Sequence, residues 1–392
     1  MGTAAAIKAV FAIGGMYGGG SERQMVSLLR HLDTRRFRPA LYLASRAGPL
    51  LEELPEELSV TSFDERYRGS HWPQRLMYRR RVLDMAKYLR EVQADVCYDR
   101  TFLMTLISAA AAQRAGVPNI STVVTDPTRG FAPIAGRFQF LKRRILRRLY
   151  RRSRFVLANS TASARNAERF YGLPAGLITT HYNGIDLERV ERLAAQPVND
   201  PWWHTRGDGR AIRIVAAGRL NREKGFHHLI DAVAQISREP AAPSFRVAIL
   251  GEGDARATLA AQIDQHQLSE SVHLVGFQNN PIAWFQSADL FVLSSLLEGM
   301  PNVLLEAMAC GTPVLSTDCP SGPAEITREG EFGALCQVDS SEALAAGIRQ
   351  YLRDPAAART RAAAAQRHVG STFSIQTAVA RLEELLELAA AR

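Results

Sequence analysis

Short apolar runs alternate with longer amphipathic stretches along nearly the whole chain of 392 residues. The short runs predict buried strands, whereas the stretches between them repeat apolar residues at helical spacing. Strands are predicted near residues 7–13, 39–44, 96–98, 119–124 and 155–159, and then near 212–217, 246–250, 272–275, 290–293, 313–316 and 334–336. Strands that alternate with helices in this way indicate parallel sheets with helices on their faces.

The helical stretches complete this pattern and suggest where the chain divides. They lie near residues 22–32, 75–91, 105–115 and 137–151, and then near 225–235, 255–266, 282–286, 302–310 and 341–353. The length predicts two domains, each a doubly wound α/β sheet, with expected bounds 1–182 and 183–374. The segment 194–210, rich in Pro, Gly, Asp and Asn, is the natural linker or surface insertion. We expect a last helix, in 375–392, to pack back on the first domain.

Composition narrows the class of protein. A chain with 46% hydrophobic and 22% charged residues is typical of a globular protein with a large core. No apolar run reaches the roughly 18 residues of a membrane span, and the N-terminus resembles a buried first strand more than a signal peptide. Four cysteines without paired spacing are expected to be reduced thiols of a cytosolic protein, with no metal site: Cys97, Cys310, Cys319 and Cys336.

Candidate chemistry is found where strands of the second half end. The first of them is followed by Gly218, and Arg219 and Lys224 then precede a helix, an arrangement that suits a phosphate. The alternative is two solvated cations in a loop. Gly251 and Gly276 also follow strands and permit close approach of a ligand, although each glycine alone is more often a simple turn residue.

The stretch "EGMPNVLLE" places one acid before a predicted helix and a second acid inside it. Pro301 suits a position at or beside the first residue of the helix, so the helix would direct its positive end toward the loop that holds Glu298. Glu306, about one turn into the helix, could accept hydrogen bonds from a ribose. The alternative is two acids that only stabilise a helix N-terminus.

These pieces together resemble the family 4 retaining glycosyltransferases of the GT-B fold. The second half contains "GRL", "KGF", "ILGEGD", "VHLVGF", "LEGMPNVLLEAMACGTPVLSTD" and "SGPAEI" in the family's order. The first half resembles the same family through "GGMYGGGSERQ", "ANSTASARNAERFYG" and "NGID". The resemblance implies two Rossmann-like domains facing across a deep cleft, the first binding the acceptor and the second the nucleotide sugar.

The resemblance also implies roles for individual residues. Arg219 and Lys224 would hold the donor diphosphate and stabilise the leaving group, Glu298 would contact the sugar, and Glu306 the ribose. Further donor contacts are implied for Gly18, Gly19, Gly20, Gly218, Gly251, Gly276, Phe277, Met300, Pro301 and Asn302. The family implies front-face transfer with retention of configuration and without a metal or cofactor, and the chain has no D-x-D motif.

One window departs from the family pattern. Many relatives carry a polar catalytic side chain near the end of the fourth or fifth strand, where this chain reads "STVVTDPTRG" with Val123 and Val124. Asp126 is the remaining acceptor-side catalytic candidate. The alternative is that Asp126 only begins the turn before Pro127.

The net charge of +9 is local, because residues 137–154 contain nine Arg or Lys and no acid. On a helical wheel, apolar residues cover one side: Phe138, Leu141, Ile145, Leu146, Leu149 and Tyr150. The cations proposed to contact an anionic membrane are Lys142, Arg143, Arg144, Arg147, Arg148 and Arg151. The alternative is a core-facing helix whose arginines are merely solvated.

The sequence therefore predicts a hexosyltransferase that moves a sugar from a nucleotide donor, UDP-linked, to a lipid-linked or membrane-associated saccharide. It would act in the cytoplasm, peripherally on the inner face of the membrane, and would not bind nucleic acid. The alternatives are a soluble transferase with a small-molecule acceptor, a nucleotide-sugar epimerase, and a non-catalytic scaffold that binds membranes or polyanions.

Overall fold

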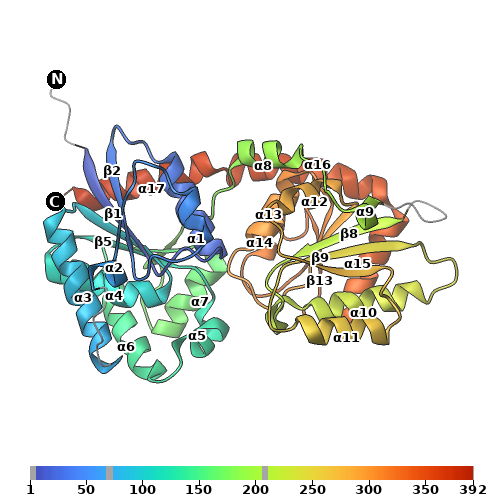
Figure 1. Ribbon diagram of the computed structural model, residues 1–392, viewed down its shortest axis with the longest axis horizontal. Helices are drawn as coiled ribbons and strands as arrows, with labels where there is room; N and C mark the ends of the chain where they lie inside the picture. Colours follow the sequence, from blue (N-terminus) through green and yellow to red (C-terminus); the bar gives the residue numbers. More distant parts are fainter. Residues whose placement is uncertain (1–5, 68–73, 205–210, 392) are drawn as a thin grey trace. The chain divides into compact units, whose positions relative to one another are not determined.

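The computed structural model describes residues 6–67, 74–204 and 211–391 (Figure 1). The chain forms two compact units: unit 1 comprises Met1–Gly184 and Ile375–Arg392, and unit 2 comprises Ile185–Ser374. The expected boundary after residue 182 lies two residues before this one. The segment 194–210 lies inside unit 2, and its residues 205–210 are outside the described ranges.

Unit 1 contains a parallel sheet whose seven described strands have the order β3-β2-β1-β4-β5-β6-β7. The strands are β1 (Ile7–Ile13), β2 (Phe37–Leu43), β3 (Ser59–Ser62), β4 (Val96–Arg100), β5 (Asn119–Val123), β6 (Phe155–Ala158) and β7 (Ile178–Thr180). The helices are α1 (Gly20–His31), α2 (Phe63–Arg66), α3 (Gln74–Glu91), α4 (Phe102–Ala115), α5 (Pro127–Ala135), α6 (Gln139–Tyr150), α7 (Thr161–Tyr171) and α17 (Ile375–Ala390), with a 3₁₀ turn η1 (Pro49–Glu53).

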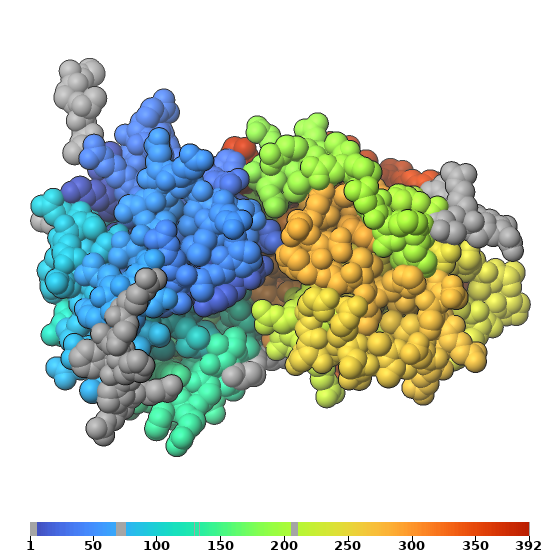
Figure 2. Space-filling model, in the orientation of Figure 1, coloured from blue at the N-terminus to red at the C-terminus, as the bar shows by residue number. Residues whose placement is uncertain are grey.

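Unit 2 contains a parallel sheet whose six described strands have the order β10-β9-β8-β11-β12-β13. The strands are β8 (Ile212–Ala217), β9 (Phe245–Leu250), β10 (Val272–Gly276), β11 (Leu290–Leu293), β12 (Val314–Thr317) and β13 (Ala334–Cys336). The helices are α8 (Leu187–Ala194), α9 (Pro201–His204), α10 (Phe226–Ser237), α11 (Arg256–Gln265), α12 (Pro281–Ser287), α13 (Asn302–Ala309), α14 (Pro323–Thr327), α15 (Ser341–Arg353) and α16 (Pro355–Thr372), with a 3₁₀ turn η2 (Arg222–Lys224). Figure 2 shows the yellow-green residues of α8 lying on the orange surface of unit 2, where α8 contacts α12 and α13.

The alternation of side chains along β1 explains the two covered faces of the unit 1 sheet. Phe11 and Ile13 pack with α1 and α17, whereas Val10 and Ala12 pack with α3 and α4. Successive residues of a strand point to opposite faces, so a strand buried on both sides is apolar throughout. Helix α17 therefore belongs to the unit 1 core although it ends the chain.

The predicted fold class is confirmed, and the strands that were missed lie at the two edges of the unit 1 sheet. The strands β3 and β7 were not predicted, and both are short edge strands with a single neighbour. Helices α2, α5, α7, α8, α9, α14 and α16 were also missed. An edge strand buries less apolar surface than a central one, so it shows a weaker hydrophobic pattern. None of the described helices is long and apolar enough to cross a bilayer.

A buried carboxyl group lies at the carboxyl end of β4. Asp99 accepts hydrogen bonds from Ser108 Oγ at 2.7 Å and Ser121 Oγ at 2.8 Å, and also from the Thr105 hydroxyl. Burial disfavours the ionised form and raises the pKa of Asp99 to about 6, while these hydroxyl hydrogen bonds oppose the shift.

Asp99 should make the folding stability of the protein decrease as the pH rises. A carboxyl pKa raised on folding from 3.8 to about 6 gives a stabilising contribution of about 3 kcal/mol below the unfolded pKa, which is lost as the pH rises through about 6. Relative to an Asp99→Asn variant, the wild-type free energy of unfolding should fall by about 1.4 kcal/mol between pH 5 and pH 8. Urea unfolding at both pH values measures this, and a difference that does not change with pH would contradict the assignment.

Candidate active site

The order of strands in unit 2 reverses between β8 and β11, which are neighbours that continue in opposite directions across the sheet. In doubly wound sheets, ligands bind outside the carboxyl ends of the strands at this switch point. The chain leaves β8 through residues 218–225 and leaves β11 through residues 294–301. These two loops therefore frame the candidate site.

An ion pair joins the two loops. Lys224 Nζ lies 2.6 Å from Glu298 Oε1, and Ser295 Oγ donates to the same oxygen at 2.7 Å. The Lys224 side chain is 24% exposed and the Glu298 side chain 9% exposed. Both hydrogen bonds found for Glu298 in the described chain end on Oε1.

Two further hydrogen bonds join the two loops beside the ion pair. Ser294 Oγ donates to the Lys224 carbonyl at 2.8 Å, and Leu296 N–H donates to the Glu223 carbonyl at 2.7 Å. Gly225 has φ +62°, and a Cβ there would lie 2.1 Å from the Ser294 oxygen. Only glycine permits this approach, so the residue after Lys224 fixes the position of the lysine relative to β11.

The glycines after the neighbouring strands bring three strand ends into backbone contact. Gly251 N–H donates to the Gly276 carbonyl at 2.8 Å, and a Cβ on Gly251 would lie 1.9 Å from the Gly218 oxygen. Gly251 also has φ +134°, which side-chain-bearing residues rarely adopt. Phe277, directly after β10, is 58% exposed at this edge of the sheet. The predicted donor-contact residues that follow β8, β9 and β10 are thus brought together.

Helix α13 begins beside the ion pair. Pro301 is its N-cap residue with extended backbone, and Asn302 is its first residue. The N-terminus of a helix carries partial positive charge, which favours an anion at this end. Glu306 is half-buried in α13, and burial, with the Glu306 charge as a smaller cause, raises the pKa of Cys310 to about 12.

Other predicted residues lie at the edge of the site or in unit 1. Arg219 is exposed in the loop after β8, and it takes part in none of the ion pairs of the described ranges. Gly18, Gly19 and Gly20 lie where α1 begins in unit 1: Gly18 has φ +99°, Gly19 is the N-cap residue and Gly20 is the first residue of the helix.

Asp126 is almost completely buried in unit 1 and acts as the N-cap of α5. Its Oδ1 accepts from Thr128 N–H at 2.8 Å, and its Oδ2 accepts from Asn166 Nδ2 at 2.6 Å. Both oxygens are therefore engaged within the fold. This geometry favours the turn-forming role that the sequence left open, and the catalytic role stays an unsupported prediction.

Sequence reasoning missed the serines that support the ion pair. Ser294 and Ser295 follow β11 directly and are buried. The signal was present, because two adjacent hydroxyl residues after a fully apolar strand are polar groups that need partners.

The basic helix α6 differs from its predicted placement. Leu146, Leu149 and Tyr150 are buried in the unit 1 core, so this part of the apolar side cannot lie on a membrane. Lys142 is half-buried and donates to the Ala135 carbonyl at 2.6 Å. The arginines of the helix are exposed: Arg143, Arg144, Arg147, Arg148 and Arg151.

The geometry defines a class of protein: two doubly wound units, of which the second has a Lys–Glu pair and a helix N-terminus at its switch point. Two family models cover most of the chain, "Glycosyltransferase Family 4" over residues 18–189 and "Glycosyl transferases group 1" over residues 205–368. Glycogen synthase of Mycobacterium tuberculosis is 30% identical over 77% of this chain and 70% of its own length. The chain belongs to the group 1 glycosyltransferases of family 4, with the GT-B fold.

Other similar proteins show the breadth of this family. A Campylobacter jejuni enzyme, N-acetylgalactosamine-N,N'-diacetylbacillosaminyl-diphospho-undecaprenol 4-alpha-N-acetylgalactosaminyltransferase, is 31% identical over 53% of this chain and 53% of its own length. The match thus spans about half of that enzyme. Among solved structures, Anabaena Alr3699/HepE in complex with UDP has a TM-score of 0.78 at 23% identity, covering 97% of this chain and 100% of its own. At that identity the likeness establishes the fold alone.

Proposed function

We propose that the protein transfers a sugar from a UDP-sugar to a lipid-linked or otherwise membrane-associated saccharide, with retention of the anomeric configuration. The observation that carries the proposal is the Lys224–Glu298 pair at the switch point of unit 2, next to the start of α13. A cation and a helix N-terminus suit a diphosphate, and an adjacent carboxylate suits sugar hydroxyls.

The proposed reaction assigns each group one task. Lys224, Arg219 and the first amides of α13 neutralise the diphosphate as the bond between sugar C1 and phosphate oxygen breaks. The acceptor hydroxyl oxygen bonds to C1 on the same face, and its proton passes to the departing phosphate oxygen. Glu298 holds the sugar through its hydroxyls, and Glu306 binds the ribose. No metal is required in this scheme, because protein cations stabilise the leaving group.

Relatives support the choice of substrates. The Campylobacter relative is named for a diphospho-undecaprenol acceptor, and a similar Rhizobium meliloti protein for lipopolysaccharide core biosynthesis. HepE, which shares the fold, was solved with UDP. We therefore propose UDP as the donor nucleotide, a polyprenyl-linked or lipid-linked glycan as acceptor, and a peripheral position on the inner face of the membrane.

A thermal-shift screen with UDP-, GDP- and dTDP-sugars tests the donor. A ligand at 100 times its Kd stabilises the folded state by about 2.7 kcal/mol, which should raise the Tm of unit 2 by roughly 5–10 °C. UMP is the matched control, because it lacks the second phosphate that Lys224 would hold. The proposal fails if no nucleotide sugar raises the Tm, or if UMP stabilises the protein as much as UDP does.

A further inference from the structure

Four large apolar side chains are exposed within eight residues at the corner between α5 and α6 of unit 1. They are Ile134, Phe138, Phe140 and Leu141, with exposed fractions of 52%, 71%, 84% and 56%. This turn projects from the lower edge of unit 1 (Figures 1 and 2). A contiguous group of exposed apolar side chains marks an interaction site more often than a free surface. We call these four residues the apolar corner.

The backbone at the apolar corner is strained. Phe138 has φ +63° and ψ +26° and is the N-cap of α6 without a side-chain capping bond. A bulky residue in the left-handed region is uncommon, and such strain concentrates at functional sites. The strained residue, Phe138, thus exposes its aromatic ring to solvent.

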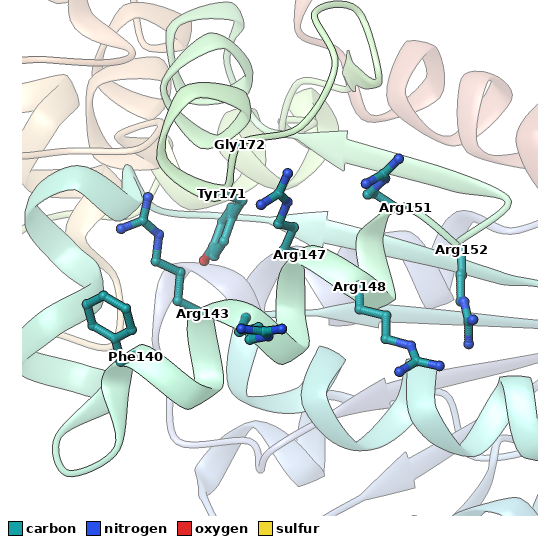
Figure 3. Close-up of a pocket in the computed structure, with 9 residues that line it drawn as sticks. Phe140, Arg143, Arg147, Arg148, Arg151, Arg152, Tyr171 and Gly172 are labelled. Carbon is teal, nitrogen blue, oxygen red and sulfur yellow. The ribbon is translucent and has the colours of Figure 1, made fainter.

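A groove rich in arginine adjoins the apolar corner. It has a volume of about 850 Å³ and is lined by Phe140, Tyr171, Gly172 and six arginines: Arg143, Arg144, Arg147, Arg148, Arg151 and Arg152. Figure 3 shows Arg143 and Arg147 on either side of the Tyr171 ring. Gly172 has φ +64°, a backbone conformation that side-chain-bearing residues rarely adopt.

The six groove arginines take part in none of the ion pairs of the described part of the chain. Arg143 instead stacks over the Phe170 ring at 4.4 Å. These six cations lie within ten residues, in α6 and directly after it, so they repel one another, and an anionic ligand relieves that repulsion. Guanidinium groups are well suited to phosphate oxygens.

The apolar corner and the arginine groove together match one kind of partner. Lipid bilayers offer a layer of phosphates directly above an apolar interior, and interfacial segments place aromatic and aliphatic side chains below a basic row. Nucleic acid would use the cations, but it offers no place for Ile134 and Leu141. The adjacent charges and apolar side chains therefore favour a membrane.

We propose that this corner of unit 1 is a membrane-inserting site: the apolar corner enters an anionic phospholipid bilayer, and the arginine groove binds lipid phosphate groups. This inference rests on the proposed function, since it gives the enzyme a means of reaching a membrane-linked acceptor. It also changes the predicted mode of contact. Helix α6 meets the bilayer through its N-terminal end, because Leu146, Leu149 and Tyr150 are occupied in the core.

Vesicle sedimentation measures the contribution of the apolar corner to membrane binding separately from that of the arginine groove. The vesicles contain phosphatidylcholine with about 30% phosphatidylglycerol, at low salt and at about 0.5 M salt, where the Debye length is short. A Phe138→Ser/Phe140→Ser/Leu141→Ser variant should bind at least tenfold more weakly at both salt concentrations. An Arg143→Gln/Arg147→Gln/Arg151→Gln variant should lose about fivefold per arginine at low salt and should be less sensitive to salt.

Matched controls lie elsewhere on unit 1. Leu388 on α17 is 47% exposed, so Leu388→Ser is the apolar control. Arg38, Arg114 and Arg165 are exposed outside the groove, so their triple Gln variant is the charge control. All substitutions are at exposed positions, and each variant must retain the wild-type Tm and the wild-type Tm increase with UDP. The inference is overturned if the Phe138/Phe140/Leu141 variant binds vesicles as the controls do.

Two further outcomes are decisive. Wild-type protein that binds duplex DNA but not the vesicles overturns the membrane assignment and makes the groove a nucleic-acid site. If UDP still stabilises the wild-type protein but the protein does not bind the vesicles, this inference alone is overturned and the donor assignment is left intact.

A Phe140→Trp variant tests insertion directly. Insertion is supported if the fluorescence of the added tryptophan shifts to the blue with vesicles and is quenched by brominated lipid, and it is contradicted if neither occurs.

Discussion

Replacing Lys224 by methionine is expected to lower kcat/KM for sugar transfer by about 10²–10³-fold. Methionine keeps the length and apolar stem of the side chain but removes the charge that lies 2.6 Å from Glu298 Oε1. The leaving diphosphate would lose a cation positioned before the reaction begins. Initial rates with a UDP-sugar and a lipid-linked acceptor measure the effect.

The control for Lys224→Met is Arg222→Met, in the same 3₁₀ turn. Arg222 is exposed and takes part in none of the ion pairs of the described residues, so its loss should change kcat/KM by less than about threefold. The Lys224 variant should also have a lower Tm, because the carboxylate of Glu298 is only 9% exposed and loses its partner. Equal rates for the two variants would remove Lys224 from the proposed mechanism.

Replacing Glu298 by glutamine should lower kcat by about 10²–10³-fold while changing the affinity for UDP by less than about threefold. The amide keeps the shape and an acceptor oxygen, but it lacks the charge that strengthens hydrogen bonds from sugar hydroxyls. UDP has no transferred sugar, so its binding should be little affected. Steady-state rates and UDP titrations separate the two quantities.

The control for Glu298→Gln is Glu223→Gln, since Glu223 is exposed and only its carbonyl contacts the other loop. If Glu298→Gln weakens UDP and the UDP-sugar equally and leaves kcat unchanged, Glu298 contacts the nucleotide rather than the sugar. That result would reverse the roles proposed for Glu298 and Glu306.

Much of the site could be predicted because its signals are local. The start of α13 follows from Pro301 and the apolar run after it, and the structure begins this helix at Asn302. Gly218, Gly251 and Gly276 could be selected because each adjoins the end of an apolar strand. At these positions the neighbouring residues in the sequence determine the local backbone conformation.

The remaining features depend on residues that are distant in sequence. Lys224 and Glu298 are separated by 74 residues, and only the pairing of β8 with β11 brings them together. Asp126 looks like a catalytic candidate in its own window, but Asn166 occupies its second oxygen. Helix α6 has one apolar side in a helical wheel, yet the core of unit 1 covers only the part around Leu146. Hydrophobic periodicity does not distinguish an apolar side chain that is buried in the core from one that stays exposed and binds a partner.

Isothermal titration of UDP into wild-type protein, Lys224→Met and Arg222→Met tests the central claim, that the switch point of unit 2 binds the nucleotide diphosphate. We expect wild-type protein and Arg222→Met to bind UDP with the same Kd. We expect Lys224→Met to bind at least tenfold more weakly, because a charge-assisted phosphate contact contributes about 1.5–3 kcal/mol. A Kd for Lys224→Met equal to the wild-type value would contradict the account.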